Sequence, residues 1–386
     1  MKKLSLLKSM LLLCALVVGS TSVWADDTYY VKVSSASELV DGGTYIIGDV
    51  VSSTAYAFVA VNNKSKGTTV SAGLSVIGNS IKVASDAETK PCEFILNATS
   101  KANVYTLKIS GGNYLGYNSG TDYQTAATLP TGSDLTKYQW TISYNSTYSC
   151  FTMVNVNSTS RVMLRKNNAS PQVYGPYSDQ NMGNADYNVA TIYKKCSAKF
   201  AADKTLVSFS CASNAIDLAH LPSGLYAYKV SAANATSVTL TEVTEAVAAN
   251  TGLILKGTAG ETYNIPTVAS GTNISASNLL VATDGTSTVS DAAVLSNGEF
   301  HPLTAGVIAA GKAYLPYAKI DGGNPFKGGA HALDIVFDNG DVTGVEQVAK
   351  SQDSWLNGQF YDLQGRKVAQ PTKGLYTVNG KKVVIK

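Results

Sequence analysis

The sequence predicts an all-β protein, and two observations carry that prediction. Beyond residue 25, no window keeps an apolar stripe at the helical period for more than about three turns. Short segments rich in β-branched and aromatic residues recur instead, each bounded by Gly, Asn, Ser or Asp, as strands are. Examples along the chain are TYIIGDV, AYAFVAV, NVYTLKI, CFTMVNV, TSVTLTEV and TGLILKG.

The first 25 residues have the pattern of a secretory signal peptide. Lys2, Lys3 and Lys8 form a positively charged start, and residues 10–18 are an apolar run. Small residues follow, and VWA precedes Asp26 as a cleavage site. We therefore expect residues 1–25 to direct the protein across the inner membrane. No later apolar run approaches the roughly 18 residues that a membrane helix needs, so we expect no transmembrane segment in the mature chain.

The charge balance excludes one large class of partner. The full chain has 30 basic and 27 acidic residues, and removal of the signal peptide takes away three lysines. The mature chain is then neutral, with 27 residues of each sign. A neutral chain lacks the basic surface that nucleic-acid binding requires, so we expect no nucleic-acid partner.

Residues 26–196 contain a faint internal repeat. TYIIG at 44–48, EFILN at 93–97 and QWTIS at 139–143 begin three blocks, and each block continues with further strand patterns. One block cannot bury its own apolar face, whereas three blocks can close on one another. The repeat predicts a β-trefoil-like domain over residues 26–196. The alternative is a two-sheet sandwich in which the repeat is accidental.

The remainder of the chain differs in composition. Residues 197–345 are richer in Ala and poorer in Tyr, and their strand patterns are separated by Gly and Asn turns, which predicts a β-sandwich domain. Residues 346–357 form a polar linker, and residues 358–386 contain strand-like runs that predict a short C-terminal β-hairpin tail.

Tyrosine marks the candidate binding site. Of the 22 tyrosines, 15 fall in residues 26–196, and several lie in two polar segments, residues 111–125 and 170–187. Exposed aromatic rings stack on the C–H faces of sugars, while amide and carboxylate groups bond to the hydroxyls. The alternative is that these rings pack into the domain core. The candidate ligand-binding residues are Tyr117, Asn118, Asp122, Tyr123, Tyr174, Tyr177 and Asp179.

The sequence contains few residues that indicate catalysis or metal binding. The three histidines, His220, His301 and His331, lie in the second domain without a nucleophile motif around them, so a secreted hydrolase is a distant alternative. The cysteines match no zinc-binding spacing, and we expect neither a metal nor another cofactor. A disulfide between Cys196 and Cys211 would close the domain junction, and buried thiols are the alternative.

The tail resembles the C-terminal sorting signal of the type IX secretion system of Bacteroidetes. The resemblance implies recognition by the secretion machinery, removal of the tail and anchoring at the outer cell surface. The tail is shorter than the complete sandwich domain of that family, and a periplasmic location is the alternative if it does not function. The matching residues are Tyr361, Leu363, Gly365, Gly374, Tyr376, Gly380, Lys381 and Lys382.

The second domain also resembles a module that is common in secreted and surface proteins of Bacteroides and Prevotella, which implies a presenting or spacer role. Together these patterns predict a non-catalytic secreted or cell-surface protein that binds carbohydrate or mucin-type glycan through the tyrosine-bearing loops of its first domain. The alternative is a structural or adhesion protein that contacts a host or bacterial surface protein through its strand edges.

Overall fold

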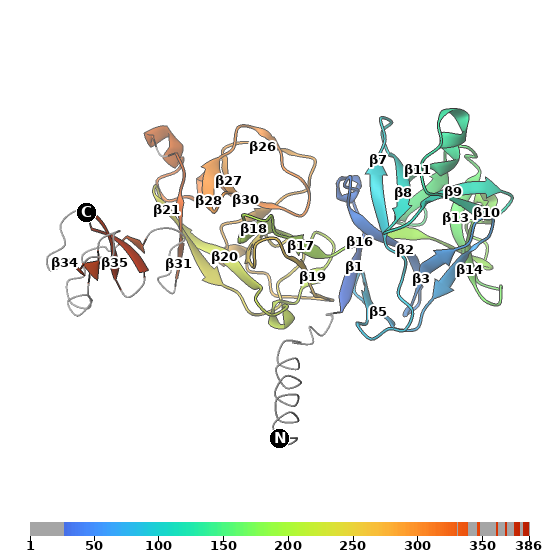
Figure 1. Cartoon of the computed structure of the whole chain (residues 1–386), viewed down its shortest axis with the longest axis horizontal. Helices are drawn as coiled ribbons and strands as arrows, with labels where there is room; N and C mark the ends of the chain where they lie inside the picture. The colour runs from blue at the N-terminus through green and yellow to red at the C-terminus, as the bar shows by residue number, and fades with distance from the viewer. Residues whose placement is uncertain are drawn as a thin grey trace, which may run out of the picture. The chain divides into compact units, whose positions relative to one another are not determined.

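A computed structural model describes residues 27–329 and 331–338, together with five short strands beyond them (Figure 1). The elements of this described part are strands and short 3-10 helices, so the all-β prediction is confirmed. No helix within it has both the length and the apolar character needed to cross a membrane. The predicted signal peptide lies outside the described residues.

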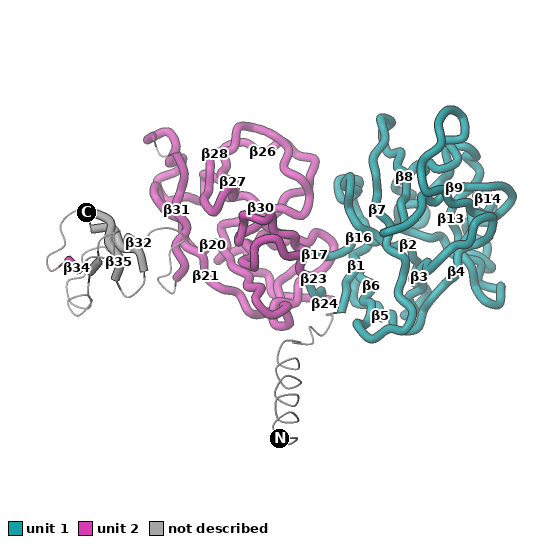
Figure 2. The backbone as a smooth tube through the Cα atoms, viewed as in Figure 1, with its two compact units in different colours: residues 1–197, 264–267 teal, residues 198–263, 268–386 magenta. Residues whose placement is uncertain are grey.

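The chain divides into two compact units (Figure 2). The first contains the described residues up to Ser197, and the second begins at Ala198. The segment Asn264–Thr267, which the sequence placed in the second domain, belongs to the first unit by its contacts. Each unit has its own apolar core.

Six strands of the first unit close into a ring. Adjacent members pair antiparallel at five of the six junctions. At the sixth junction, β12 and β16 lie side by side, and the Thr191 hydroxyl donates to the Phe151 carbonyl at 2.9 Å. In ring order the strands are β2 (Thr44–Val51), β7 (Phe94–Ala98), β8 (Val104–Ile109), β11 (Gln139–Asn145), β12 (Cys150–Asn155) and β16 (Thr191–Lys195).

Three hairpins interrupt the ring strands in the sequence and meet one another. β14 pairs with β4, Ser65 forms a bridge with Tyr123 at the start of β10, and β10 lies beside β14. Along the chain, the order is ring strand, hairpin, ring strand, repeated three times. The hairpins are β3 (Thr54–Val61) with β4 (Gly67–Val70), β9 (Tyr114–Ser119) with β10 (Asp122–Ala126), and β13 (Arg161–Lys166) with β14 (Val173–Ser178).

This order corrects the phase of the predicted repeat. The equivalent blocks begin at β2, β8 and β12, whereas the predicted starts at residues 93 and 139 belong to β7 and β11, the last strands of their blocks. The last two predicted starts each fall one ring strand too early, because β7 and β8, like β11 and β12, are successive ring strands. The first block is longer because it includes the hairpin of β5 (Leu74–Ile77) and β6 (Ser80–Val83), which pairs with β1 (Thr28–Lys32). Assignment to the β-trefoil fold stays a prediction.

Aromatic side chains fill the core of the first unit. The ring of Phe58 lies 5.4 Å from that of Phe94 and 5.7 Å from that of Tyr123, both in edge-on geometry. The buried indole of Trp140 donates to the Leu115 carbonyl at 3.0 Å, so its polar atom is satisfied. A side chain at Gly67 would overlap the Phe58 ring, which explains glycine in this strand.

The second unit is a sandwich-type arrangement of two sheets. Val230 and Leu240 from the larger sheet share one core with Phe300 and Leu315 from the smaller sheet. The larger sheet has the order β18 (Leu206–Phe209), β22 (Leu253–Lys256), β20 (Tyr226–Ala233), β21 (Ser237–Glu242) and β31 (Asp334–Phe337). The smaller sheet has the order β25 (Val281–Ala282), β30 (Ala313–Pro316), β27 (Ala292–Ser296) and β28 (Glu299–Pro302).

Shorter elements complete the described chain. The remaining strands are β15 (Tyr187–Val189), β17 (Ser197–Lys199), β19 (Ala215–Ile216), β23 (Thr262–Asn264), β24 (Thr267–Val268), β26 (Thr288–Val289) and β29 (Gly306–Val307). The 3-10 helices are η1 (Ala36–Glu38), η2 (Gly132–Tyr138), η3 (Asp179–Asn181), η4 (Leu218–His220), η5 (Ser275–Ser277), η6 (Tyr317–Lys319) and η7 (Pro325–Gly328).

The tail forms a separate five-stranded sheet. Its order is β32 (Glu346–Gln347), β36 (Lys381–Ile385), β35 (Gly374–Val378), β33 (Phe360–Tyr361) and β34 (Lys367–Val368). β32 lies within the predicted linker and pairs parallel with β36. Of the predicted sorting residues, Leu363, Gly365 and Gly380 lie outside the described residues. The others, Tyr361, Gly374, Tyr376, Lys381 and Lys382, lie on strands of this sheet.

Candidate ligand-binding site

The structure buries the tyrosines that were predicted to contact a sugar. Tyr123 and Tyr174 are completely inaccessible, and Tyr117 and Tyr177 are buried as well. The polar segments that contain them are strands of the hairpins β9–β10 and β13–β14, and alternate side chains of a strand point to the same face. The expectation that these four rings lie exposed for stacking is therefore wrong.

The three polar residues of the prediction are half-buried and engaged with near neighbours. Asp122 forms an ion pair with Lys66 at 3.3 Å, Asn118 donates to the Ser119 hydroxyl, and Asp179 accepts a hydrogen bond from Ser178. The two predicted segments do approach each other, because the Thr121 carbonyl lies against Gly175. None of the seven predicted residues lines the pocket described next.

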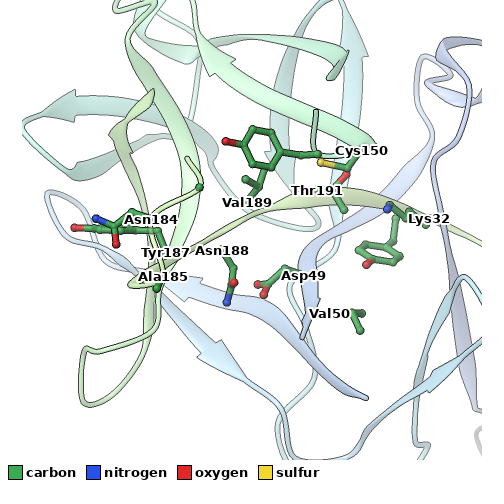
Figure 3. Close-up of a pocket in the computed structure, with 13 residues that line it drawn as sticks. Lys32, Asp49, Val50, Cys150, Asn184, Ala185, Tyr187, Asn188, Val189 and Thr191 are labelled. Carbon is green, nitrogen blue, oxygen red and sulfur yellow. The ribbon is translucent and has the colours of Figure 1, made fainter. Parts of the chain in front are cut away.

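A pocket of about 410 Å³ lies elsewhere in the first unit (Figure 3). It collects residues from β1, β2, the turn between β11 and β12, the start of β12, β15 with the segment that precedes it, and β16. The size is that of typical small-ligand sites. The lining residues that carry polar or aromatic groups are Lys32, Asp49, Tyr148, Cys150, Asn184, Tyr187, Asn188, Thr191 and Tyr193.

A buried ion pair anchors Asp49 in this pocket. Arg165 donates to the Asp49 carboxylate from Nε at 2.9 Å and from Nη2 at 2.7 Å, and the Tyr174 hydroxyl donates to it at 2.7 Å. The guanidinium also lies 3.6 Å from the centre of the Tyr56 ring and donates to Gln172. These five groups form one network across β2, β3, β13 and β14, with Gln172 just before β14.

The network keeps its charges paired. Burial raises the pKa of Asp49, although the hydrogen bonds and charge of Arg165 and the hydrogen bond of Tyr174 act in the opposite direction. Burial also works against the charge of Arg165, but the hydrogen bonds and charge of Asp49 outweigh it and raise the pKa of the guanidinium. Arg165 therefore remains charged and compensates the carboxylate at the pocket surface.

Polar groups in the walls of the pocket keep part of their hydrogen-bonding capacity for a ligand. In Figure 3, Asn184 and Tyr187 stand on one side and Lys32 on the other, with Asp49 and Asn188 between them. Asn184 accepts from the Asp186 amide through Oδ1, which leaves its Nδ2 available. Asn188 donates to Asn167 at 2.6 Å, which leaves its Oδ1 available.

Two aromatic rings complete these walls. Tyr148 is half-buried in the turn between β11 and β12, and its hydroxyl lies close to Gly183. Tyr187 is also half-buried and packs edge-on against Tyr177 at 5.0 Å. The pocket thus joins aromatic faces to amide and ammonium groups, a set that suits a hydroxylated ring with a polar rim.

The histidines show no catalytic arrangement in the described part of the chain. His220 lies 2.9 Å from Asp217, and His301 lies 3.5 Å from Glu299. Neither imidazole hydrogen-bonds to a serine among the described residues. Between residues 27 and 338, as far as they are described, no three His, Cys, Asp or Glu side chains gather as metal ligands would.

The four cysteines of the described residues are thiols. Cys196 and Cys211 are buried in different units, and the predicted disulfide between them is not formed in this structure. Burial raises the pKa of Cys92 to about 12, with a smaller contribution from Glu93. Burial likewise raises the pKa of Cys150, although Lys32 acts in the opposite direction.

We expect Cys92 and Cys150 to resist alkylation in the folded protein. The thiolate is the nucleophile, and a raised pKa keeps the thiol protonated at mildly alkaline pH. Iodoacetamide at about pH 8 should label neither residue in the native protein and both in guanidinium chloride, as read by peptide mass spectrometry. Native labelling of Cys92 at the rate of the unfolded chain would contradict its burial.

The chain matches no protein-family model and no curated protein.

Sequence reasoning missed most residues of the pocket. Lys32, Asp49 and Tyr148 lie on segments that are well separated in the sequence, and no local pattern joins them. Asn184 and Tyr187 do fall within the polar segment 170–187 that the sequence singled out. Its Asn, Gly and Asp content near residues 181–187 was the available signal, because these residues follow the last hairpin strand rather than forming part of it.

Proposed function

We propose that this protein is a non-catalytic binding protein that recognises carbohydrate or mucin-type glycan through the pocket of its first unit. The observation that supports this proposal is the pocket, which is lined by Tyr148 and Tyr187 together with Asn184 and Asn188. Tyrosine rings stack on sugar C–H faces, and amides both donate to and accept from hydroxyls. The buried tyrosines of the hairpins serve as the core that holds this surface.

We further propose that the first unit is a β-trefoil and that the protein acts outside the inner membrane, at the cell surface or in the medium. The closed six-strand ring with three interspersed hairpins supports the fold. The signal-peptide pattern of residues 1–25 and the sorting-signal resemblance of residues 358–386 support export. The sandwich of the second unit would then present the binding unit.

Replacing Tyr148 by Ala tests the pocket. We expect at least a roughly tenfold loss of affinity for a bound glycan in titration calorimetry, which corresponds to about 1.4 kcal/mol of lost contact. Tyr148 is preferable to Tyr187 because Tyr187 also packs against Tyr177. The unfolding midpoint should change little because Tyr148 is on a turn.

Tyr144→Ala is the matched control. Tyr144 is 54% exposed on the neighbouring strand β11, packs against Phe151, and does not line the pocket. Its replacement should leave glycan affinity unchanged. Equal losses in the two variants, or no loss in either, would contradict binding at this pocket.

A further inference from the structure

We infer that the pocket selects acidic glycans, with Lys32 as the residue that pairs with a sugar carboxylate or sulfate. This inference rests on the proposed function and adds the chemical class of the ligand. The argument depends on which charges at the pocket are already compensated and which one is not.

Two charged side chains line the pocket, Lys32 and Asp49. The charge of Asp49 is compensated within the protein, because the ion pair with Arg165 is 2.7 Å long and both side chains are almost completely buried. No carboxylate of the described residues lies within ion-pair distance of Lys32. A ligand therefore meets one uncompensated positive charge.

Lys32 is held at the pocket but keeps binding capacity. Its ammonium donates to the Ser149 carbonyl at 3.0 Å, and an ammonium has three protons, so two remain for a ligand. Ser149 has a left-handed φ of 49°, at the end of the turn that also contains Tyr148. β1 fixes the stem of Lys32 opposite Tyr193 of β16, which is another lining residue.

The ammonium also acts on the pocket electrostatically. Burial raises the pKa of the Cys150 thiol, a lining group, and the positive charge of Lys32 partly offsets that rise. This effect places the charge within reach of the cavity, in agreement with the position of Lys32 in Figure 3.

The arrangement suits a ligand with a neutral end and an acidic end. A sugar ring against Tyr187, with its hydroxyls on Asn184 and Asn188, would leave a substituent directed across the pocket toward Lys32 (Figure 3). A negative group at that point forms a charge-assisted hydrogen bond, which is stronger than a hydrogen bond between neutral groups. A neutral hydroxyl there gains less, so the pocket discriminates between the two.

The test compares matched glycans that differ only in charge. One pair is a glycan ending in a carboxylate-bearing sugar and its counterpart without that sugar, and the other is a sulfated glycan and its desulfated form. We expect the protein to bind the acidic member of at least one pair about tenfold more tightly, with the preference falling as salt increases. The pair that shows the preference identifies the acidic group.

Lys32→Gln should remove the preference by lowering affinity for the acidic member to about that for the neutral member. Lys32→Arg should retain it, because the charge is kept. Lys101→Gln is the matched control, since Lys101 is exposed on the first unit and does not line the pocket. Equal thermal unfolding of the variants would show that a lost preference is not a folding defect.

Two results would overturn the inference. If the wild-type protein binds neutral and acidic members equally, or if Lys32→Gln keeps the preference, Lys32 does not select the ligand and the proposed glycan binding stands without it. If no glycan of either kind binds, the proposed function fails and the inference fails with it.

Discussion

Replacing Arg165 by Met is expected to destabilise the first unit by roughly 3–5 kcal/mol. The substitution would leave the Asp49 carboxylate buried with the Tyr174 hydroxyl as its remaining donor, in place of two hydrogen bonds and a neutralising charge. It would also remove the guanidinium from the Tyr56 ring. Chemical unfolding followed by tryptophan fluorescence would measure the loss, because Trp140 lies in the core of the same unit.

The double variant Asp49→Leu with Arg165→Met distinguishes two causes of the stability loss, an unpaired buried charge and a packing defect. Removal of both partners leaves no uncompensated charge, and Tyr174 can still donate to the Tyr56 carbonyl, 3.0 Å away. We expect the double variant to be more stable than the single Arg165→Met variant. A single variant that loses less than about 1 kcal/mol would contradict the buried ion pair.

Replacing Tyr123 by Ala is expected to cost a similar amount, roughly 3–5 kcal/mol. The ring is inaccessible and lies between Phe58, at 5.7 Å, and Trp140, at 6.2 Å, so its removal would open a cavity in the centre of the aromatic core. Glycan affinity of the protein that remains folded should not change, because Tyr123 does not line the pocket.

Tyr123→Phe is the informative companion. The Tyr123 hydroxyl is buried and has no hydrogen-bond partner in the described structure, which costs about 1–3 kcal/mol when the group is desolvated. Phe keeps the ring and removes that cost, so we expect stability equal to or above that of the wild type. If Tyr123→Ala were harmless to stability and abolished glycan binding, the ring would be a ligand contact and the described core would be wrong.

The fold class could be predicted because strand patterning is local. The segment TYIIGDV became β2 and NVYTLKI became β8, and each contains a continuous run of buried residues. The phase of the repeat could not be predicted, because successive ring strands such as β7 and β8 carry the same pattern. The position of each in the ring depends on pairing with strands far away in the sequence.

The burial of the tyrosines shows that local amino-acid composition does not predict whether a side chain is exposed. Tyr117 and Tyr123 stand among Gly, Asn, Asp and Ser, which is typical of loops, yet they pair across the β9–β10 hairpin. Small polar neighbours are compatible with a tight hairpin as well as with a loop. Whether such a segment forms a hairpin or a loop depends on how the three hairpins pack against one another. That packing joins residues that are far apart in the sequence.

The pocket could not be predicted from the sequence for the same reason. Arg165 and Asp49 are 116 residues apart, and Lys32 and Ser149 are 117 residues apart. Closure of the ring brings β1, β2, β12 and β16 together, and only then do these groups become neighbours. A buried arginine is also rare enough that its partner is not predictable from one sequence.

The most direct test of the account is a glycan and mucin array probed with the purified protein and with Tyr148→Ala. The account predicts saturable binding of the wild type to a defined glycan and its loss in the variant. A silent array from a protein that unfolds cooperatively would contradict glycan recognition. Adhesion to a surface protein through strand edges would then become the leading explanation.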